Sequence, residues 1–318
     1  MFPFGELTKT GSRMRGILHR ELSIALAFHP KKETKNHSFH MAMASYSPRE
    51  TDRLLGGHNN AAIPPRESQY NRLINHLTLD IDPTHGDFIL LFCYVITGLL
   101  DSSAVFVWGS FVSMQTGNTV YLGLGLMGVD ESTRWIRAFI SIASFCVGSL
   151  CFSSFYRSFS SRRRWVLCAS FTIQMLCVAA AATIVTIHQT SRDSPLTWKV
   201  VVPLILVAFQ SSGQAVTSRV LQFNGLTSVV LTSVYCDLFS NSVLPPFSML
   251  YAVEERRRGG AVVCLLLGTM LGGLWAKSSV GLMGAFWTAV FCKACIAAAW
   301  LVWRGQPMEG MGVEGENE

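Results

Sequence analysis

The stretch GLLDSSAVFVWGSFVSMQTGNTVYLGLGL, residues 98–126, decides how this chain folds. It is apolar enough to enter a lipid bilayer, yet it contains the carboxylate of Asp101 and the polar step QTGNT at residues 115–119. An ionised side chain at mid-bilayer costs roughly 2.5 to 3.5 kcal/mol on insertion scales, so such groups usually face a bundle interior or a wet cavity. Within the polar step, Gly weakens a helix, and Thr and Asn compete for its backbone hydrogen bonds. The stretch therefore predicts a broken membrane helix.

Composition and the lengths of the apolar stretches predict an all-α, polytopic membrane protein in contact with a lipid bilayer. Of the 318 residues, 50% are hydrophobic and 14% are charged, whereas about 25% are charged in an average globular domain. Six apolar stretches have the roughly twenty residues that a helix needs to cross a hydrocarbon core. They span residues 88–108, 135–156, 165–187, 200–221, 260–280 and 281–303. Two further stretches, 110–127 and 222–244, are apolar but interrupted by polar residues.

Arginine clusters indicate how these stretches thread through the membrane. The clusters are Arg157 with residues 162–164, then residues 256–258, and finally Arg304. Eight crossings would put the first two clusters on opposite sides, whereas six crossings put every cluster and the N-terminal tail on one side. Because basic residues are enriched on the cytoplasmic side, we expect six crossings and cytoplasmic N and C termini, in either the plasma membrane or an organelle. The two interrupted stretches are then broken or re-entrant, which requires protein or water to cover their backbone.

Three regions are expected along the chain. Residues 1–86 are polar and lack periodicity, which predicts a disordered tail, and Met41 is an alternative start to Met1. Residues 87–304 form the membrane domain, and residues 305–318 form a short acidic tail.

A shift of 109 residues aligns Asp101-Ser102-Ser103 with Gln210-Ser211-Ser212. This suggests a 3+3 internal repeat with halves of about 87–195 and 196–304, in which the second half would be inverted, a recurring transporter plan.

Polar residues inside the apolar stretches are the candidate substrate-binding or pathway residues. Asp101 could exchange a proton or pair with a cation; the alternative is that it caps a helix half or bonds a neighbouring segment. The other candidates supply backbone and side-chain oxygens in the broken stretches, or share one helical face. They are Thr116, Gly117, Asn118, Thr119, Gln210, Gln214 and Thr227. The alternative role for these residues is helix packing and interhelical hydrogen bonding.

Lys293 lies near the middle of the last apolar stretch, too deep to reach the membrane surface easily. We expect an intramembrane charge network that joins it to Asp101 or Asp237, the two acids within membrane segments; such buried pairs are often structural. Cys292 and Cys295 have the spacing of a metal pair, but a zinc site would need two further ligands. All eight histidines lie outside the apolar stretches. No metal and no cofactor are therefore expected.

Several function classes lack their sequence signatures. The chain has no phosphate-binding Gly-x-x-x-x-Gly-Lys-Ser/Thr motif, no nucleophile elbow and no His-Glu-x-x-His, so we expect neither ATP-driven transport by this chain nor an enzyme. Its net charge of +6 comes with basic residues that look like topology signals, so nucleic acid is not an expected partner. The oligomeric state is left open.

The two interrupted stretches carry a family resemblance. The first contains Gly98-x-x-Asp101, then Thr116-Gly117-Asn118-Thr119-Val120 and the step Leu122-Gly123. The second contains Gln210, Arg219, Thr227, Leu231 and Thr232. In these motifs the chain resembles the YoaK-like family of membrane proteins, which carry domain of unknown function 1275. Many relatives look like Gln-Asn and Thr-Gly where this chain has Gln210-Ser211 and Thr232-Ser233. The resemblance covers roughly residues 87–304 and implies a six-span membrane protein, without a substrate or reaction.

The leading hypothesis is a secondary transporter or channel-like permease for a small solute or ion, with its site near the bilayer midplane. The alternative is a non-transporting membrane scaffold or assembly protein, and an intramembrane enzyme is third. A water-accessible cavity that contains Asp101 and Asn118 would favour transport. A dry bundle with every polar group paired would favour the scaffold.

Overall fold

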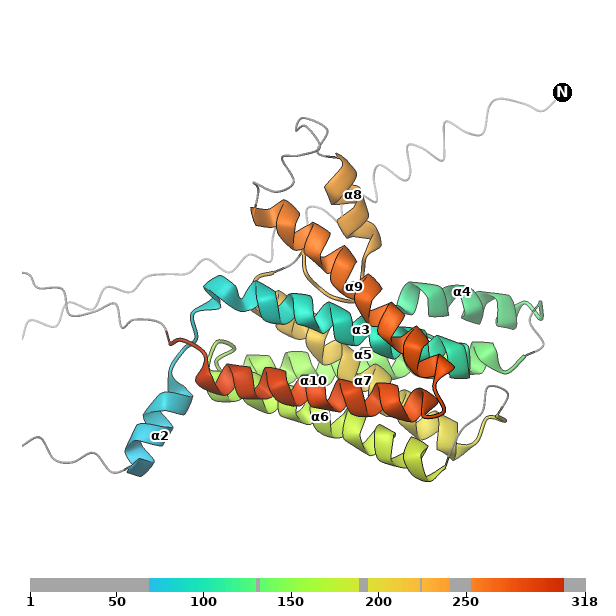
Figure 1. The fold of residues 1–318 in the computed structure, drawn as a ribbon, viewed down its shortest axis with the longest axis horizontal. Helices are drawn as coiled ribbons and strands as arrows, with labels where there is room; N and C mark the ends of the chain where they lie inside the picture. The colour runs from blue at the N-terminus through green and yellow to red at the C-terminus, as the bar shows by residue number, and fades with distance from the viewer. Residues whose placement is uncertain (1–68, 130–131, 189–193, 224, 241–252, 306–318) are drawn as a thin grey trace, which may run out of the picture. The chain divides into compact units, whose positions relative to one another are not determined.

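Nine α-helices form the described part of the chain. The computed structural model describes residues 69–129, 132–188, 194–223, 225–240 and 253–305 (Figure 1). The helices are α2 (Gln69–Thr78), α3 (Gly86–Trp108), α4 (Gln115–Leu126), α5 (Arg134–Ser158), α6 (Arg164–Ile187), α7 (Trp198–Val220), α8 (Thr232–Ser240), α9 (Val253–Lys277) and α10 (Gly281–Val302), with a 3-10 turn η2 (Pro83–His85) before α3. Six of them, α3, α5, α6, α7, α9 and α10, are long and apolar enough to cross a membrane. This confirms the all-α, six-span fold expected from the sequence.

The short helices α4 and α8 occupy the two interrupted stretches. After α3 the chain turns at Gly109, whose φ of 69° lies in the left-handed region that favours glycine, and helix resumes only at Gln115. After α7 a second irregular segment precedes α8, and Gln222 and Ser228 also have positive φ there. Both α3 and α7 are therefore followed by a break and then by a short helix, as predicted for broken segments.

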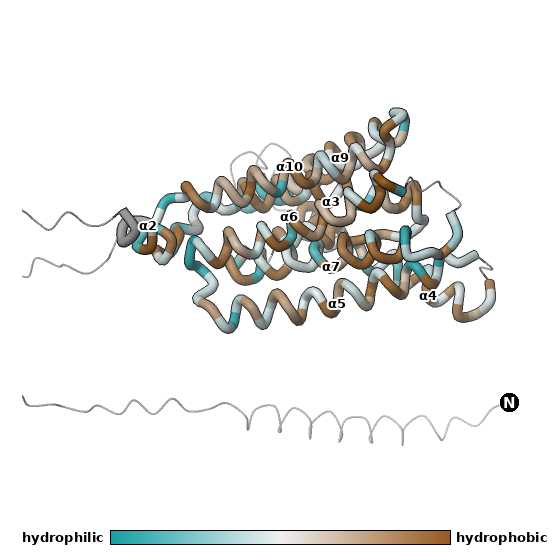
Figure 2. Tube along the Cα trace, turned by 90° about the horizontal axis from the view of Figure 1, so that it is seen from below, coloured by the Kyte–Doolittle hydropathy of each residue, from teal (hydrophilic) through white to brown (hydrophobic). Residues whose placement is uncertain are grey.

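Helices α3 and α7 form the centre of the bundle. In their most apolar windows 67% and 72% of the residues are buried, against 22% in α5 and 17% in α9. In Figure 2 the long helices are mainly brown and white, with the strongest teal mostly toward helix ends and connections. Apolar side chains of α5 and α9 such as Leu150, Val263 and Met270 are exposed, and lipid can cover them, since a bilayer offers no penalty to apolar surface.

Small residues allow α9 to cross α3 closely (Figure 1). A Cβ added to Gly268 would lie 2.1 Å from the carbonyl oxygen of Val95, and one added to Gly98 would lie 2.3 Å from that of Leu265. These distances are far below van der Waals contact, so only glycine fits at these positions. Backbone approach through small residues is a usual way for membrane helices to associate.

Helices α3 and α7 run in opposite directions. The ring of Phe223, which follows α7, lies 3.3 Å from the place of a Cβ on Gly86, the first residue of α3. At the other end of the bundle, Arg137 donates to the carbonyl of Trp108, the last residue of α3, at 2.9 Å. Arg137 also donates to the carbonyl of Ser194, just before α7, at 2.6 Å. Opposite directions are what an inverted repeat requires, while the repeat itself stays a prediction.

Segments far apart in sequence meet at the end of the bundle where α3 begins. The N–H of Ile81 donates to the carbonyl of Arg162 at 2.9 Å, and the N–H of Asp82 donates to the carbonyl of Arg304 at 3.0 Å. Isolated bridges pair residue 80 with 163 and residue 81 with 305. The segment before the first span, the α5–α6 connection and the segment after the last span therefore share one end.

The remaining arginine cluster lies at the same end. Arg257 in the first turns of α9 forms an ion pair of 2.9 Å with Asp87, in the first turn of α3. Helix α9 begins at Val253, seven residues before the expected start of its apolar stretch at residue 260. The first turns of the helix carry Glu254, Glu255 and the arginines at 256–258, so they lie outside the apolar stretch from which the start was expected.

Part of the region expected to be a disordered tail is ordered. Residues 69–78 form α2, and Ile81 is fully buried. The guanidinium of Arg164 donates to the carbonyls of His76 and Trp303, which ties this segment to the ends of α6 and α10. The described order therefore begins before residue 86, because α2 is amphipathic and the residues that follow it pair with the backbone of Arg162 and Arg304. Residues 1–68 and 306–318 lie outside the described residues.

Candidate functional site

Asp101 holds the start of the short helix α4. Its side chain is 3% exposed, and its Oδ1 accepts hydrogen bonds from the backbone N–H of Val112 at 2.8 Å and of Ser113 at 2.9 Å. The hydroxyl of Ser113 donates to Oδ2. The chain thus folds back after Gly109 until residues 112 and 113 lie beside the middle of α3. In this position the carboxylate bonds the segment that precedes α4, whose N-cap is Met114.

Asn118 closes the other side of the same turn. Its Oδ1 accepts from the hydroxyl of Ser110 and the N–H of Phe111, both at 3.0 Å. Its Nδ2 donates to the carbonyl of Phe111 and to Oε1 of Gln115, both at 2.8 Å. All of the amide's hydrogen-bonding capacity is therefore used inside the segment, and the side chain is fully buried.

Neighbouring helices complete the pairing of this turn. The hydroxyl of Ser141 on α5 donates to the carbonyl of Phe111 at 2.7 Å, and that of Ser211 on α7 donates to the carbonyl of Val112 at 2.8 Å. Non-helical backbone at membrane depth is tolerated only where protein or water satisfies it. Residues 110–113 meet this condition through side chains of α3, α4, α5 and α7. We call this arrangement the α3–α4 turn.

The other candidates of the QTGNT step face away from this interior. Thr116 and Thr119 are exposed, and the hydroxyl of Thr119 donates to the carbonyl of Gln115 at 2.9 Å, within its own helix. Gly117 lies under the ring of Phe111, where a Cβ would come within 2.6 Å of the ring. Asn118 alone is buried among the residues of α4.

Lys293 lies in the centre of the bundle and is held by two glutamines. Its side chain is fully buried. The Nζ atom donates to Oε1 of Gln174 on α6 at 2.7 Å and to Oε1 of Gln214 on α7 at 2.6 Å. The same Nζ lies 5.6 Å from the centre of the Phe171 ring. We call Lys293, Gln174 and Gln214 the polar core, together with the buried Gln210, which lies one helical turn before Gln214 on α7.

The glutamines are themselves positioned by neighbouring groups. Nε2 of Gln214 donates to the carbonyl of Cys93 at 3.2 Å and to the hydroxyl of Thr97 at 3.3 Å, both on α3. Nε2 of Gln174 donates to the hydroxyl of Ser170, one turn earlier on α6, at 3.3 Å. Four helices, α3, α6, α7 and α10, therefore meet at the lysine.

In the described residues Lys293 is bonded to glutamines and not to Asp101 or Asp237, the acids of the expected ion pair or hydrogen-bond network. Asp101 is occupied by the α3–α4 turn, and Asp237 lies on α8 with half of its side chain exposed, 3.8 Å from Arg258. The sequence indicates how far each charged residue lies from the ends of its apolar stretch. It does not indicate which helix faces pack together, and so it does not identify the partner of Lys293. Gln174 was not among the candidates for the site, although it is a polar residue in the otherwise apolar α6.

Gln210 has no partner in the described part of the chain. The side chain is fully buried, and neither its Nε2 nor its Oε1 forms a hydrogen bond there. It lies one helical turn before Gln214, so the two share a face of α7. Thr227, the last candidate, is half-buried in the α7–α8 connection. Burying an amide without hydrogen-bond partners lowers the stability of the folded state by roughly 1–3 kcal/mol. The position of Gln210 is therefore better explained by a ligand or another functional role than by stability.

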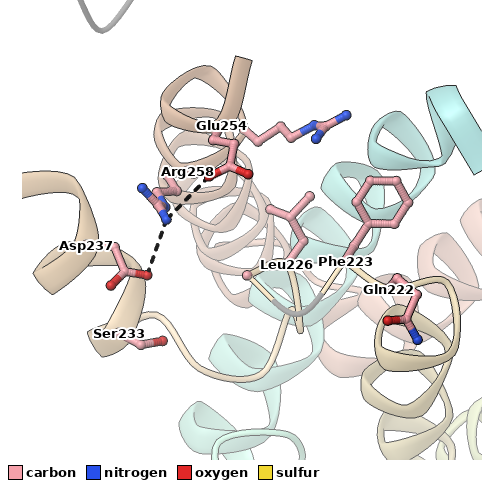
Figure 3. Close-up of a pocket in the computed structure, with 9 residues that line it drawn as sticks. Gln222, Phe223, Leu226, Ser233, Asp237, Glu254 and Arg258 are labelled. Carbon is pink, nitrogen blue, oxygen red and sulfur yellow. Dashed lines mark ion pairs between the residues drawn. The ribbon is translucent and has the colours of Figure 1, made fainter. Parts of the chain in front are cut away.

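Two cavities open at opposite ends of the bundle. One of about 510 Å³ lies between the α7–α8 connection, α8 and the start of α9 (Figure 3). Figure 3 shows Arg258 between Asp237 and Glu254, each at 3.8 Å. The other, about 390 Å³, lies at the far end of α3 and is lined by Trp108, Arg134 and Arg137. The ring of Trp108 packs edge-on against Phe286 of α10 at 5.6 Å, and both rings are buried.

Comparison with known proteins identifies a family but no activity. The model of the family described as "Protein of unknown function (DUF1275)" matches residues 89–299. This range begins inside α3 and ends inside α10, so it includes all six long helices, the α3–α4 turn and the polar core. The searches of curated proteins and of solved structures found no match.

Proposed function

The chain belongs to the DUF1275 family, and from its polar core we propose that it is a secondary transporter or permease for a small solute or ion. The solute would bind near the bilayer midplane, at Lys293 and the glutamines around it. Of the residues where the sequence places the site, the proposal keeps Gln210 and Gln214. It replaces Asp101 and the QTGNT step with Lys293 and Gln174. It assigns the chain transport rather than catalysis.

The observation that carries the proposal is the environment of Lys293. The residue lies near the middle of α10, and its Nζ donates to two neutral amide oxygens and lies over an aromatic ring. Ionisable residues at this depth are costly and usually mark substrate or ion pathways. A structural role alone would be served by a carboxylate partner, and Lys293 has none among the described residues.

The arrangement around the polar core fits alternating access. Cavities lie at both ends of the bundle, and between them the polar core and the Trp108–Phe286 contact fill the interior. Broken helices that surround a buried site at mid-depth recur in secondary transporters. The described conformation corresponds in this proposal to a closed state, in which neither end reaches Lys293.

One observation favours a non-transporting scaffold instead. The α3–α4 turn is buried, and the backbone groups of Phe111 and Val112 are paired, so Asp101 and Asn118 act there as structural residues. A scaffold would use the polar core in the same way, to hold four helices together. The unpartnered Gln210 is the feature that a purely structural bundle does not explain.

Uptake into reconstituted vesicles tests the proposal. Vesicles with the purified chain would be offered a panel of labelled inorganic ions, small carboxylates, amino acids and sugars. We expect at least one solute to enter faster than into empty vesicles, and the substitution Lys293→Met to abolish this difference. Lys277→Met, at the exposed end of α9, is the matched control and should transport like the unmodified chain.

The outcome that would overturn the proposal is equal uptake of every solute by protein-containing and empty vesicles, with the protein shown to be folded. If Lys293→Met transports the solute as fast as the unmodified chain, the protein is a transporter but the polar core is not its binding site. A scaffold predicts no uptake, together with a loss of thermal stability in Lys293→Met.

The arginine clusters also support an orientation. We propose that the end of the bundle where α3 begins, with both described chain ends, faces the cytoplasm. Residues 162–164, 256–258 and 304 lie at this end, and basic residues in short loops are enriched on the cytoplasmic side.

A further inference from the structure

We propose that the solute is a small monovalent anion, held between Lys293 on α10 and Gln210 on α7. The inference rests on the proposed transport function and adds the chemical class of the solute. It concerns the polar core and does not involve the α3–α4 turn.

The charge around Lys293 is the first argument. The hydrogen-bond partners of its Nζ are the neutral amide oxygens of Gln174 and Gln214, and the ring of Phe171 lies 5.6 Å away. The thiols of Cys93, Cys177 and Cys292 lie near enough to interact with its charge, and none of these three side chains is a carboxylate. An isolated ammonium group in a low-dielectric interior is strongly unfavourable without a compensating negative charge. An anion supplies this charge, whereas a cation would add repulsion at the same place.

The hydrogen-bond inventory is the second argument. A lysine ammonium carries three N–H donors, and Gln174 and Gln214 accept two of them. One donor is left for a ligand. Gln210 adds two more, because no group in the described residues accepts from its Nε2. Its position one turn from Gln214 puts the two side chains on neighbouring places of one helix face, with Cβ atoms about 6 Å apart.

The tight packing of the polar core limits the size of the anion. A Cβ on Gly213 would lie 2.7 Å from Nε2 of Gln174, so the Gln174 side chain packs directly against the backbone of α7 beside the lysine. Lys293, Gln174, Gln210 and Gln214 are each at most 1% exposed. An anion of a few heavy atoms, such as a halide, nitrate, formate or acetate, fits this description better than a large or multivalent one.

Thermal unfolding of the purified full chain in detergent tests the inference. The midpoint would be measured in sodium chloride, nitrate, formate and acetate, each against sodium gluconate at equal concentration and pH. A ligand that binds the folded state raises the midpoint as its concentration exceeds the dissociation constant. We expect a saturable rise with at least one of the small anions, and a dissociation constant raised at least about tenfold in Lys293→Gln.

Two further variants keep the experiment decisive. Lys277→Gln, far along α9, should keep the dissociation constant of the unmodified chain. If Lys293→Gln does not fold, Gln210→Leu removes the second donor without touching the lysine's bonds, and it should raise the dissociation constant about threefold or more. The inference is overturned if no small anion differs from gluconate, which would mean that Lys293 donates its two bonds as a neutral amine. Unchanged binding in both Lys293→Gln and Gln210→Leu would overturn it as well.

Failure of the inference and failure of the transport proposal give different results. Anion-dependent stabilisation without uptake of any solute would support the anion site and contradict the transport proposal. Uptake of a cation or a neutral solute, with no anion-dependent stabilisation, would support the transport proposal and contradict the anion site.

Discussion

At the scale of single residues, Asn118 shows how one side chain replaces a missing length of helix. Its amide makes four hydrogen bonds, three of them to Ser110 and Phe111 in the non-helical turn. We expect Asn118→Ala to lower the free energy of unfolding by roughly 2 kcal/mol or more, because each buried group left unpaired costs about 1–3 kcal/mol. Thermal or denaturant unfolding followed by tryptophan fluorescence measures this change.

Thr119 is the matched control for this prediction. It is the next residue on α4, is exposed, and bonds only within its own helix, so Thr119→Ala should change stability by less than about 0.5 kcal/mol. Equal effects of the two substitutions would contradict a special role for Asn118.

Residues also mark the limit of what the sequence predicts about the site. Lys293 was correctly expected to lie deep in a span, because depth follows from position within an apolar stretch. The hydrogen-bond partners of Lys293 were not predicted, because hydrophobic periodicity does not show which faces of four different helices meet. Two neutral glutamines accept two of the lysine's three donors, and Asp101 accepts from backbone N–H groups instead.

At the scale of elements, the contact between α3 and α9 depends on glycine. A Cβ on Gly268 would meet the carbonyl oxygen of Val95 at 2.1 Å, whereas one on Gly273, on the same helix, would meet nothing within 4 Å. We expect Gly268→Ala to destabilise the protein by roughly 1–3 kcal/mol, since the two backbones must separate. Gly273→Ala should be neutral or stabilise by up to about 1 kcal/mol, because alanine favours helix.

Unfolding curves of the two variants under the same conditions test this contrast. A loss of stability in Gly273→Ala as large as in Gly268→Ala would show that glycine is needed along α9 for a reason other than close packing.

The six spans were predictable because about twenty apolar residues are required in each. The early start of α9 was not, since its charged first turns extend the helix beyond the apolar stretch.

At the scale of the whole membrane domain, six crossings place the connections at two opposite ends. The α5–α6 connection shares its end with the segments before α3 and after α10, whereas Ser194 and Pro195 lie beside the end of α3. Eight crossings would need both α4 and α8 to span, and α4, with 12 residues, is not long enough. A helix of 12 residues is about 18 Å long, well short of a hydrocarbon core of roughly 30 Å.

Labelling with a membrane-impermeant thiol reagent tests this topology together with the proposed orientation. In a variant without the nine native cysteines, a single cysteine would replace either Ser160 or Pro195, both exposed in connections. In sealed cells or right-side-out vesicles we expect the cysteine at position 195 to react and that at position 160 to react only after permeabilisation. The reverse pattern would keep six crossings and invert the orientation, because both positions would still lie on opposite sides. Reaction of both cysteines before permeabilisation would contradict six crossings, since an odd number of spans must separate residue 160 from residue 195.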